Sequence, residues 1–220
     1  MATTATVIRR LASDTTNLPP DVSPGGTAGA LLDSALQLFA EQGFAGASIR
    51  DIAAAAGVTS ATLYAHYPSK GHILAHVVEI AHTEHHRRLR AALLASDADP
   101  ANQLTSLVRA HVLMHAEYPM LSVVANAELH AVPPELVARS LDLRGRSEEL
   151  LNEVIARGIE LGRFDPPHAW MAAAAIGGMG IRVAHWFTEN FEATAEQVAD
   201  TYAEFARRLV GAGSHDGGEQ

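Results

Sequence analysis

Between residues 47 and 70, hydroxyl, carboxyl and ammonium side chains stand at spacings that indicate specific hydrogen bonds and contacts with a ligand. No other stretch of the sequence has so many such signals. The stretch reads ASIRDIAAAAGVTSATLYAHYPSK. Ser48 precedes Asp51 by three residues, which lets each side chain cap the other's backbone amide at the start of a helix. Gly57 can adopt the left-handed conformation that ends such a helix. Thr59 can then cap a second short helix, so the pattern predicts two short helices joined by a tight turn.

Two short helices with a glycine in the connecting turn form the helix-turn-helix unit, whose second helix enters the major groove of DNA. On that second helix we expect Leu63 and Tyr67 to face inward. The outward side chains are small or phenolic, which suits a close approach to base edges and phosphates. The residues expected to face outward are Thr59, Ser60, Ala61, Thr62 and Tyr64.

Lys70, the single lysine of the chain, follows Pro68 and falls in the first turn of the next helix. A cation at a helix N-terminus opposes the helix dipole by roughly 0.3–1 kcal/mol. A phosphate held at the same place would instead be attracted by the ammonium, the dipole and the free amides together. The position therefore predicts a phosphate clamp.

The cation content of the region is low for a nucleic-acid partner. The whole chain has a formal net charge of -9, and residues 27–74 have a formal balance of -1. Binding would then rely on neutral donors and helix N-termini, with Arg9 and Arg10 as added cations from the N-terminal arm, and its salt dependence should be shallow. The charged residues counted are Arg50 and Lys70 against Asp33, Glu41 and Asp51.

Histidine pairs at four-residue spacing are a second set of candidate ligands. Each pair places two imidazoles on one helix face, which can bind zinc or nickel if further ligands complete the site. His130, Glu128 or Glu117 would have to supply those ligands. We expect solvated or pocket-edge histidines instead, with no bound metal and no cofactor. The pairs are His72/His76, His82/His86 and His111/His115.

The elements that must position these residues are predicted to be helices throughout. Apolar residues from Leu31 to Phe39 recur at three- and four-residue spacing, as one buried helix face requires. Thr27 and Gly43 are the expected caps of this first helix, over residues 28–42. Prolines mark most of the later boundaries. The further helices are predicted over 49–56, 60–66, 70–95, 101–117, 120–129, 134–161, 167–188 and 195–210.

Composition excludes several functional classes. The chain is 48% apolar and has no cysteine, which excludes disulfide frameworks, cysteine-ligated metals and cysteine nucleophiles. We find no nucleophile–base pair and no phosphate loop, so an enzyme is not expected. The longest weakly polar run, 169–181, is shorter than the roughly 20 residues that span a bilayer. We therefore expect a soluble, cytoplasmic protein without a membrane partner.

Residues 28–74, including ALQLFAEQGFAGASIRDIAAAAGVTSATLYAHYPSKGHIL, resemble the DNA-binding domain of the TetR (tetracycline-repressor-like) family of bacterial regulators. The resemblance implies an all-α homodimer with three N-terminal helices for DNA and a larger C-terminal domain for pairing and a small-molecule effector. Ala61 stands where many members have glycine, and Tyr67 where most have phenylalanine. The implied DNA contacts are Ser48, Arg50, Thr59, Ser60, Ala61, Thr62, Tyr64, His66 and Lys70.

The resemblance also suggests how the chain is divided. A flexible arm over 1–26 would precede the DNA-binding domain at 27–74. An effector-binding and dimerisation domain over 75–211 and a disordered tail over 212–220 would follow.

The larger domain contains a candidate effector pocket. The helix at 101–117 presents apolar side chains with imidazoles and a phenol, and methionine and tryptophan elsewhere provide adaptable walls. Any one of these residues could equally belong to the core. The stretch from Tyr118 to Phe164 resembles regulators of lipid and acyl-CoA catabolism, which implies an effector of that kind. The expected pocket residues are Leu107, His111, Met114, His115, Tyr118, Met120, Trp170, Met171 and Met179.

The helices at 167–188 and 195–210 are candidates for pairing two chains. Small residues over 172–180 leave one face of the first helix open to close approach, as in a four-helix bundle. Packing within one chain is the alternative. A dimer would read a near-palindromic operator, and we expect a repressor that a hydrophobic or acyl-CoA-like effector releases. The alternative is a TetR-like small-molecule or metal-sensing protein with weak or lost DNA binding.

Overall fold

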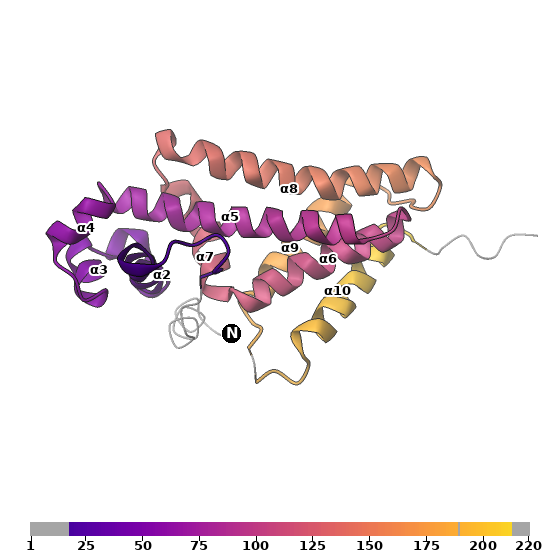
Figure 1. Cartoon of the computed structure of the whole chain (residues 1–220). Helices are drawn as coiled ribbons and strands as arrows, with labels where there is room; N and C mark the ends of the chain where they lie inside the picture. The colour runs from indigo at the N-terminus through magenta and orange to yellow at the C-terminus, as the bar shows by residue number, and fades with distance from the viewer. Residues whose placement is uncertain (1–17, 189, 213–220) are drawn as a thin grey trace, which may run out of the picture. The chain divides into compact units, whose positions relative to one another are not determined.

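The computed structural model of the chain describes residues 18–188 and 190–212. Arg9, Arg10 and most of the expected tail lie outside the described residues. The helices are labelled in Figure 1. Their bounds are α2 (Gly26–Gly46), α3 (Ile49–Ala55), α4 (Ser60–His66), α5 (Lys70–Ala95), α6 (Pro100–Glu117), α7 (Pro119–Ala127), α8 (Pro134–Glu160), α9 (Ala169–Val183) and α10 (Ala195–Leu209), with a 3-10 turn η1 (Leu129–Ala131).

The helix boundaries follow the predicted ones closely from α3 onward. Their ends agree within two residues, except that α9 stops at Val183 rather than at 188. Prolines occupy the first positions of α6, α7 and α8, where the missing amide of proline costs nothing. The sequence pattern therefore located these helices correctly.

The first helix departs from its predicted caps. It begins after Gly25, which makes no side-chain cap, so the assignment of Thr27 as the cap is wrong. Gly43 has φ 72° and ψ 164° and interrupts the helix, but one further turn follows it to Gly46. The break was correctly located, whereas the extra turn was missed because distant residues hold it.

The described residues pack as two compact units, and α5 and α8 each contribute to both. The first unit contains the chain up to Glu84 together with Tyr118–Leu143. In it, α3 packs on α2 and on α4, and α7 packs on α2, as Figure 1 shows. Its core consists of fully buried apolar side chains, each worth roughly 1.5–3 kcal/mol of burial free energy. They include Leu31, Leu36, Phe39, Ile52, Leu63, Ile73 and Leu74.

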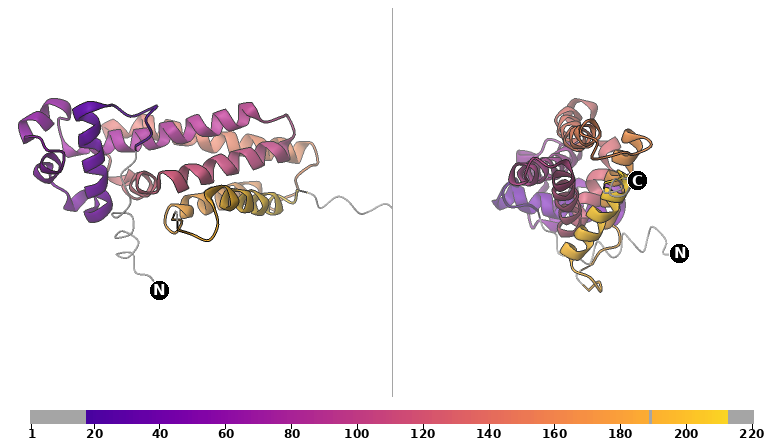
Figure 2. Two further views of the ribbon diagram at one scale, coloured as in Figure 1. Left: turned by 60° about the horizontal axis from the view of Figure 1, so that its bottom comes forward. Right: turned by 90° about the vertical axis from the view of Figure 1, so that its right-hand side faces the viewer.

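The second unit contains His85–Glu117 and the chain from Arg144 onward. Here α6 lies side by side with α10 and also packs on α9, and Figure 2 shows the α6–α10 pair. A separate apolar core joins these helices to the C-terminal half of α8. It includes Leu104, Val108, Val154, Ile155, Ile176, Ala203 and Ala206.

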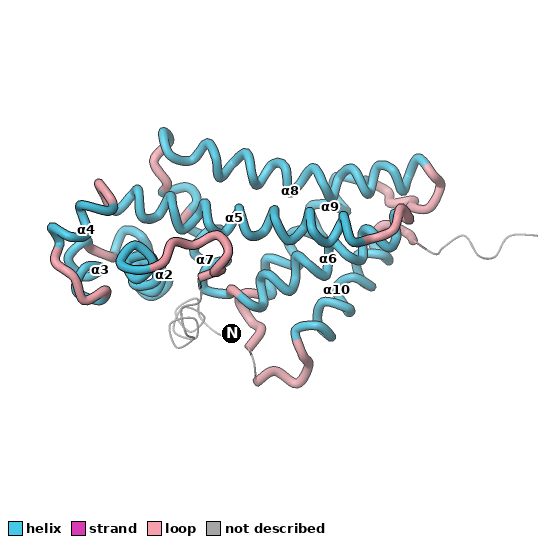
Figure 3. The backbone as a smooth tube through the Cα atoms, in the orientation of Figure 1, coloured by secondary structure: helices cyan, strands magenta, loops and turns pink. Residues whose placement is uncertain are grey.

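Figure 3 shows helices and loops and no strand in the part of the chain that the structure describes. The all-α expectation is thereby confirmed for residues 18–188 and 190–212. Within the same residues, no helix combines the length and the apolar character that crossing a membrane requires.

Candidate nucleic-acid interface

A side-chain cap at Ser48 starts α3. The Asp51 amide donates to Ser48 Oγ at 3.1 Å, as the sequence predicts. The carboxylate, however, accepts from the Ser48 hydroxyl at 2.6 Å instead of returning to the Ser48 amide. Aspartate is one methylene shorter than the glutamate of a full capping box, so its carboxylate meets the nearer hydroxyl.

The turn between α3 and α4 is closed by the glycine that the sequence singled out. Gly57 has φ 68°, and its amide donates to the Ala54 carbonyl at 3.1 Å. The Val58 amide donates to the Ala53 carbonyl at 2.9 Å. These two bonds are those of a Schellman motif, so the predicted left-handed helix end is confirmed.

Helix α4 divides into a buried face and an open face. Thr59 Oγ1 accepts from the Thr62 amide at 3.1 Å, which confirms the predicted cap, and the two threonine hydroxyls lie 3.0 Å apart. Leu63 and Tyr67 are buried, whereas 54% of Tyr64 is exposed. Ala61 and His66 are exposed, and Ser60 is half-buried. The helix thus presents small hydroxyl and methyl groups and one phenol to its surroundings.

Lys70 is the first residue of α5, as the sequence predicts, and its ammonium contacts backbone carbonyls of the preceding part of the chain. Its Nζ donates to the carbonyl oxygens of Phe44 at 2.6 Å and Ala47 at 2.7 Å, and it lies 4.4 Å from the centroid of the Phe44 ring. The last carbonyl oxygens of a helix have no hydrogen-bond donor within the helix, and here the Lys70 ammonium is that donor. The side chain therefore reaches the end of α2, and Arg50 is the exposed cation of residues 27–74.

A partly buried tyrosine–histidine contact joins the end of α4 to α5. The hydroxyl of Tyr67 lies 3.0 Å from Nδ1 of His76. Burial raises the pKa of Tyr67 and lowers the pKa of His76, the latter effect being opposed by Glu79. The hydrogen bond between the two side chains ties the residue that follows α4 to α5.

The histidine pairs are engaged in other contacts. His72 Nδ1 lies 2.9 Å from Ser69 Oγ, and His86 Nδ1 lies 3.2 Å from Ser147 Oγ. Within residues 18–188 and 190–212, no three or more histidine, aspartate or glutamate side chains are grouped to hold a metal ion.

Two of the expected pocket residues, His111 and His115, meet a third histidine in the second unit. His111 Nδ1 lies 2.8 Å from His85 Nε2, and His111 Nε2 lies 3.0 Å from the Gly177 carbonyl oxygen. His115 Nδ1 lies 2.8 Å from the His111 carbonyl oxygen. A carbonyl can only accept, so His111 carries its proton on Nε2 and His115 on Nδ1. Burial lowers the pKa of His111, and the bond to Gly177 acts in the opposite direction.

The other expected pocket residues are distributed over different surroundings. Leu107 and Met114 are buried in the second unit, and Met179 is partly buried there. Trp170 and Met171 are instead 68% and 49% exposed. In the first unit the structure buries the remaining two expected residues, Tyr118 and Met120.

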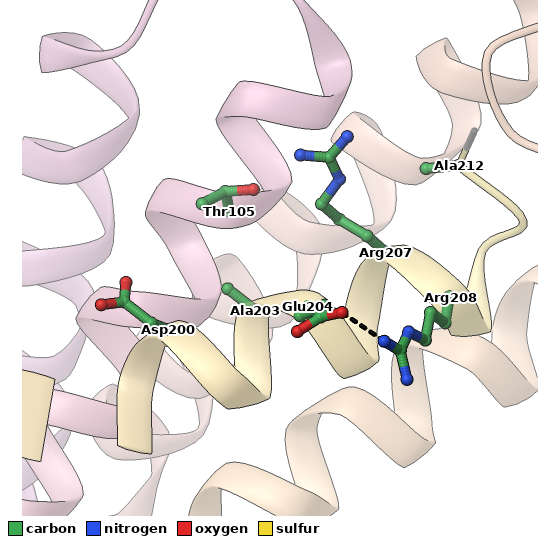
Figure 4. A pocket seen from close by; sticks show the side chains of 7 residues that line it. All are labelled: Thr105, Asp200, Ala203, Glu204, Arg207, Arg208 and Ala212. Carbon is green, nitrogen blue, oxygen red and sulfur yellow. Dashed lines mark hydrogen bonds and ion pairs between the residues drawn. The ribbon is translucent and has the colours of Figure 1, made fainter. Parts of the chain in front are cut away.

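A surface hollow of about 430 Å³ lies between α6 and α10, and Figure 4 shows the side chains around it. Arg208 is paired with Glu204, and Asp200 with Arg109. None of the nine expected pocket residues lines it, because sequence spacing did not reveal that α6 and α10 would be neighbours. Its lining residues are Thr105, Asp200, Ala203, Glu204, Arg207, Arg208 and Ala212.

Two family profiles match the chain. Residues 31–77 match bacterial regulatory proteins of the tetR family. Residues 97–210, more than half of the chain, match the tetracyclin repressor-like C-terminal domain.

Individual proteins show the same similarity. The HTH-type transcriptional repressor KstR2 of Rhodococcus jostii (strain RHA1) is 27% identical over 192 residues, which are 84% of this chain and 92% of the relative. The crystal structure of a tetR-family regulatory protein from Rhodococcus RHA1 has a TM-score of 0.80 at 28% identity, covering 86% of this chain and 99% of that one. AibR, solved with isovaleryl coenzyme A and operator DNA, shares the fold with a TM-score of 0.74 at 22% identity, covering 85% and 100%.

Proposed function

The chain belongs to the TetR family of bacterial transcriptional regulators, and from this membership we propose that it is a repressor that binds a near-palindromic operator as a homodimer. The observation that carries the proposal is the division of α4 into two faces. Leu63 and Tyr67 anchor the helix, while Tyr64 and the small residues beside it stay open. Such a face fits a duplex groove.

The proposed DNA contacts lie on two helices. Ser48 and Arg50 belong to the start of α3, and the others follow along α4. Short side chains bring the backbone close to base edges, and a threonine methyl can contact the methyl of thymine. The α4 contacts are Thr59, Ser60, Ala61, Thr62, Tyr64 and His66. Lys70, which the sequence predicts as a further contact, donates to the carbonyl oxygens of Phe44 and Ala47 instead.

Sparse cations give the proposed interface a distinctive salt dependence. Each neutralised phosphate contributes about -0.9 to the slope of log affinity against log salt concentration. Arg50 is the exposed cation of residues 27–74, and Arg9 and Arg10 are further candidates on the N-terminal arm. The slope of a dimer should therefore be shallow, and a slope as steep as about -8 would refute this electrostatic account.

Exposed apolar side chains support pairing through α9 and α10. Trp170 and Met171 on α9, and Phe205 and Leu209 on α10, are exposed in the single chain. Large exposed apolar side chains of this kind mark interaction sites. A second copy of the same helices would cover them and would complete the proposed four-helix bundle.

The proposed effector is a small hydrophobic or acyl-CoA-like molecule. AibR, which has the same fold, is a protein solved with isovaleryl coenzyme A. In the second unit, the apolar side chains of Leu107 and Met114 lie on the same helix as His111 and His115, so one helix provides both apolar and polar groups. A difference of about 1–3 kcal/mol in effector affinity between two helix arrangements would release the operator. We place this regulation in the cytoplasm.

The test uses the full-length protein and its own upstream region. A mobility-shift series should show specific binding over a scrambled duplex, and footprinting should show two related half-sites. Thermal-shift screening against acyl-CoAs, hydrophobic drugs and divalent metals then tests the effector. Stabilisation by metals alone would overturn the effector assignment.

The scarce cations favour a second candidate, a TetR-like binding protein that has lost DNA binding. Because Lys70 donates to the carbonyl oxygens of Phe44 and Ala47, Arg50 is the one exposed lysine or arginine of residues 27–74. This candidate predicts stabilisation by a small molecule but no selective binding of the upstream duplex. The two assays above therefore separate the two candidates.

A further inference from the structure

The short turn over 43–47, at the end of α2, is held by residues from two other helices of the first unit. Gly43 leaves the helical conformation, and the Ala47 amide donates back to the Gly43 carbonyl at 3.3 Å. The Phe44 ring packs edge-on against Phe39, with 5.5 Å between the ring centroids. The turn leads directly into Ser48, the cap of α3.

Glu128 holds the amide side of this turn. Its Oε1 accepts from the Phe44 amide at 3.0 Å, and it stands at the C-terminal cap of α7. A carboxylate beside the first amides of a helical turn is favourable for the backbone dipole. A residue from the end of α7, 84 positions away in sequence, therefore anchors the turn.

Lys70 holds the carbonyl side of the same turn. Its ammonium bonds the Phe44 and Ala47 carbonyls and lies over the Phe44 ring. A cation beside the last carbonyls of a helix completes the favourable dipole pairing. The amide of Phe44 is thus held by an acid from α7, and its carbonyl by a base from the start of α5.

These contacts lie at both ends of the helix-turn-helix segment. Ala47 directly precedes Ser48, the cap of α3, and Lys70 lies four residues after the last residue of α4. A second contact reinforces the same place, because Pro133, just before α8, packs against Gly71 so closely that a Cβ there would lie 2.8 Å from Pro133 Cγ. The residues that border the helix-turn-helix segment are therefore held against the end of α7 and the residues that follow it.

We infer that Glu128 and Lys70 are positioning residues for operator binding, which clamp the Phe44 turn from its two sides and hold the helix-turn-helix segment in one orientation on α7. The inference rests on the proposed function. It assigns Lys70 to the protein's own backbone and not to a DNA phosphate. Glu128, although negatively charged, would strengthen the binding of DNA, because it orients the helix-turn-helix segment.

The experiment compares Lys70→Met, Glu128→Met and Glu128→Gln in the full-length protein, with Arg50→Met as the matched loss of an exposed cation. Each is titrated with a duplex from the protein's upstream region and with a random duplex, across a salt series. Hydrogen exchange of residues 43–48 is measured without DNA. Thermal unfolding and helix content verify that each variant is folded.

Loss of Lys70 should weaken upstream-duplex binding about tenfold and random-duplex binding much less, with the salt slope unchanged. Arg50→Met should instead reduce the steepness of the slope by about 0.9 per phosphate contact. Lys70→Met behaving like Arg50→Met would overturn the inference and restore Lys70 as a phosphate contact.

The two Glu128 variants test whether loss of this acid weakens or strengthens DNA binding. Both Glu128 variants remove the same negative charge, which by electrostatics alone would tighten DNA binding. Glu128→Met should nevertheless bind about tenfold more weakly, because it lacks the acceptor, whereas Glu128→Gln should stay within about threefold of wild type. Equal binding by the two variants overturns the inference.

Hydrogen exchange separates the clamp from the function. Exchange over 43–48 should be about tenfold faster in Lys70→Met and Glu128→Met than in wild type. If exchange over 43–48 is unchanged in these two variants, the clamp is overturned, whatever their affinity for the operator. Wild-type protein that does not prefer the upstream duplex would instead overturn the proposed function, and with it the role of the clamp in reading DNA.

Discussion

His111 donates a hydrogen bond of 3.0 Å from Nε2 to the carbonyl oxygen of Gly177 and so joins α6 to α9. The same imidazole lies against Gly180, where a Cβ would collide with the ring. Glycine at this position gives the histidine its place against the helix, and burial in turn lowers the pKa of that histidine.

Gly180→Ala should destabilise the protein by about 1–3 kcal/mol, because the added methyl forces the His111 ring out of its site. The matched control is Gly177→Ala on the same helix, where a Cβ meets nothing within 4 Å. That control should be neutral or stabilising by up to about 1 kcal/mol, since alanine favours the helix. Urea unfolding measures both free energies, and equal values for the two variants would show that the close contact does not matter.

The stability of the protein should fall as the pH drops below about 6.5, the ordinary pKa of an unfolded histidine. The folded-state pKa of His111 is lowered, so below that pH the unfolded chain binds a proton that the folded chain excludes. The contribution approaches at most about 1.4 kcal/mol per pH unit and is absent above pH 7. Unfolding free energies at pH 7.5, 6.5 and 5.5 measure it. His111→Gln should flatten the dependence; an unchanged profile would assign the effect to other histidines, such as His76.

Phe205→Asp should shift the protein toward monomer by at least tenfold in dimer dissociation constant, because it places a charge on the proposed α9–α10 face. Phe205 is 41% exposed in the single chain, so its replacement should leave the fold of the chain intact. Leu94→Asp is the control, since Leu94 is 79% exposed and belongs to α5, outside the two proposed pairing helices. Analytical ultracentrifugation measures both. If the dimer persists in Phe205→Asp but dissociates in Leu94→Asp, the interface does not include the proposed α9–α10 face.

Tyr64→Ala should weaken operator binding by about 1–3 kcal/mol while leaving binding to random DNA and the thermal unfolding temperature nearly unchanged. The expectation follows from the open position of Tyr64 on α4. Tyr64→Phe separates the hydroxyl from the ring, because it keeps the stacking surface and removes one hydrogen-bonding group. Promoter fragments titrated at constant salt provide the affinities, and wild-type affinity of Tyr64→Ala would remove α4 from the interface.

Local sequence determined the caps and turns of the reading segment. Ser48, Gly57 and Thr59 act on backbone groups no more than four residues away, so their roles follow from spacing and residue type. The inward placement of Leu63 and Tyr67 follows in the same way from the period of a helix. For these positions the interactions that decide the structure lie within the window in which the pattern is read.

Tertiary structure alone decided which distant groups the long and buried polar side chains meet. Lys70 finds its carbonyls 26 and 23 residues away, and Glu128 finds Phe44 across 84. A flexible charged side chain takes the nearest unsatisfied partner, and only the packing of α2, α5 and α7 determines which carbonyl or amide that is. A spacing pattern places a charge at a position on a helix, whereas the bond that charge makes depends on the helix packed beside it.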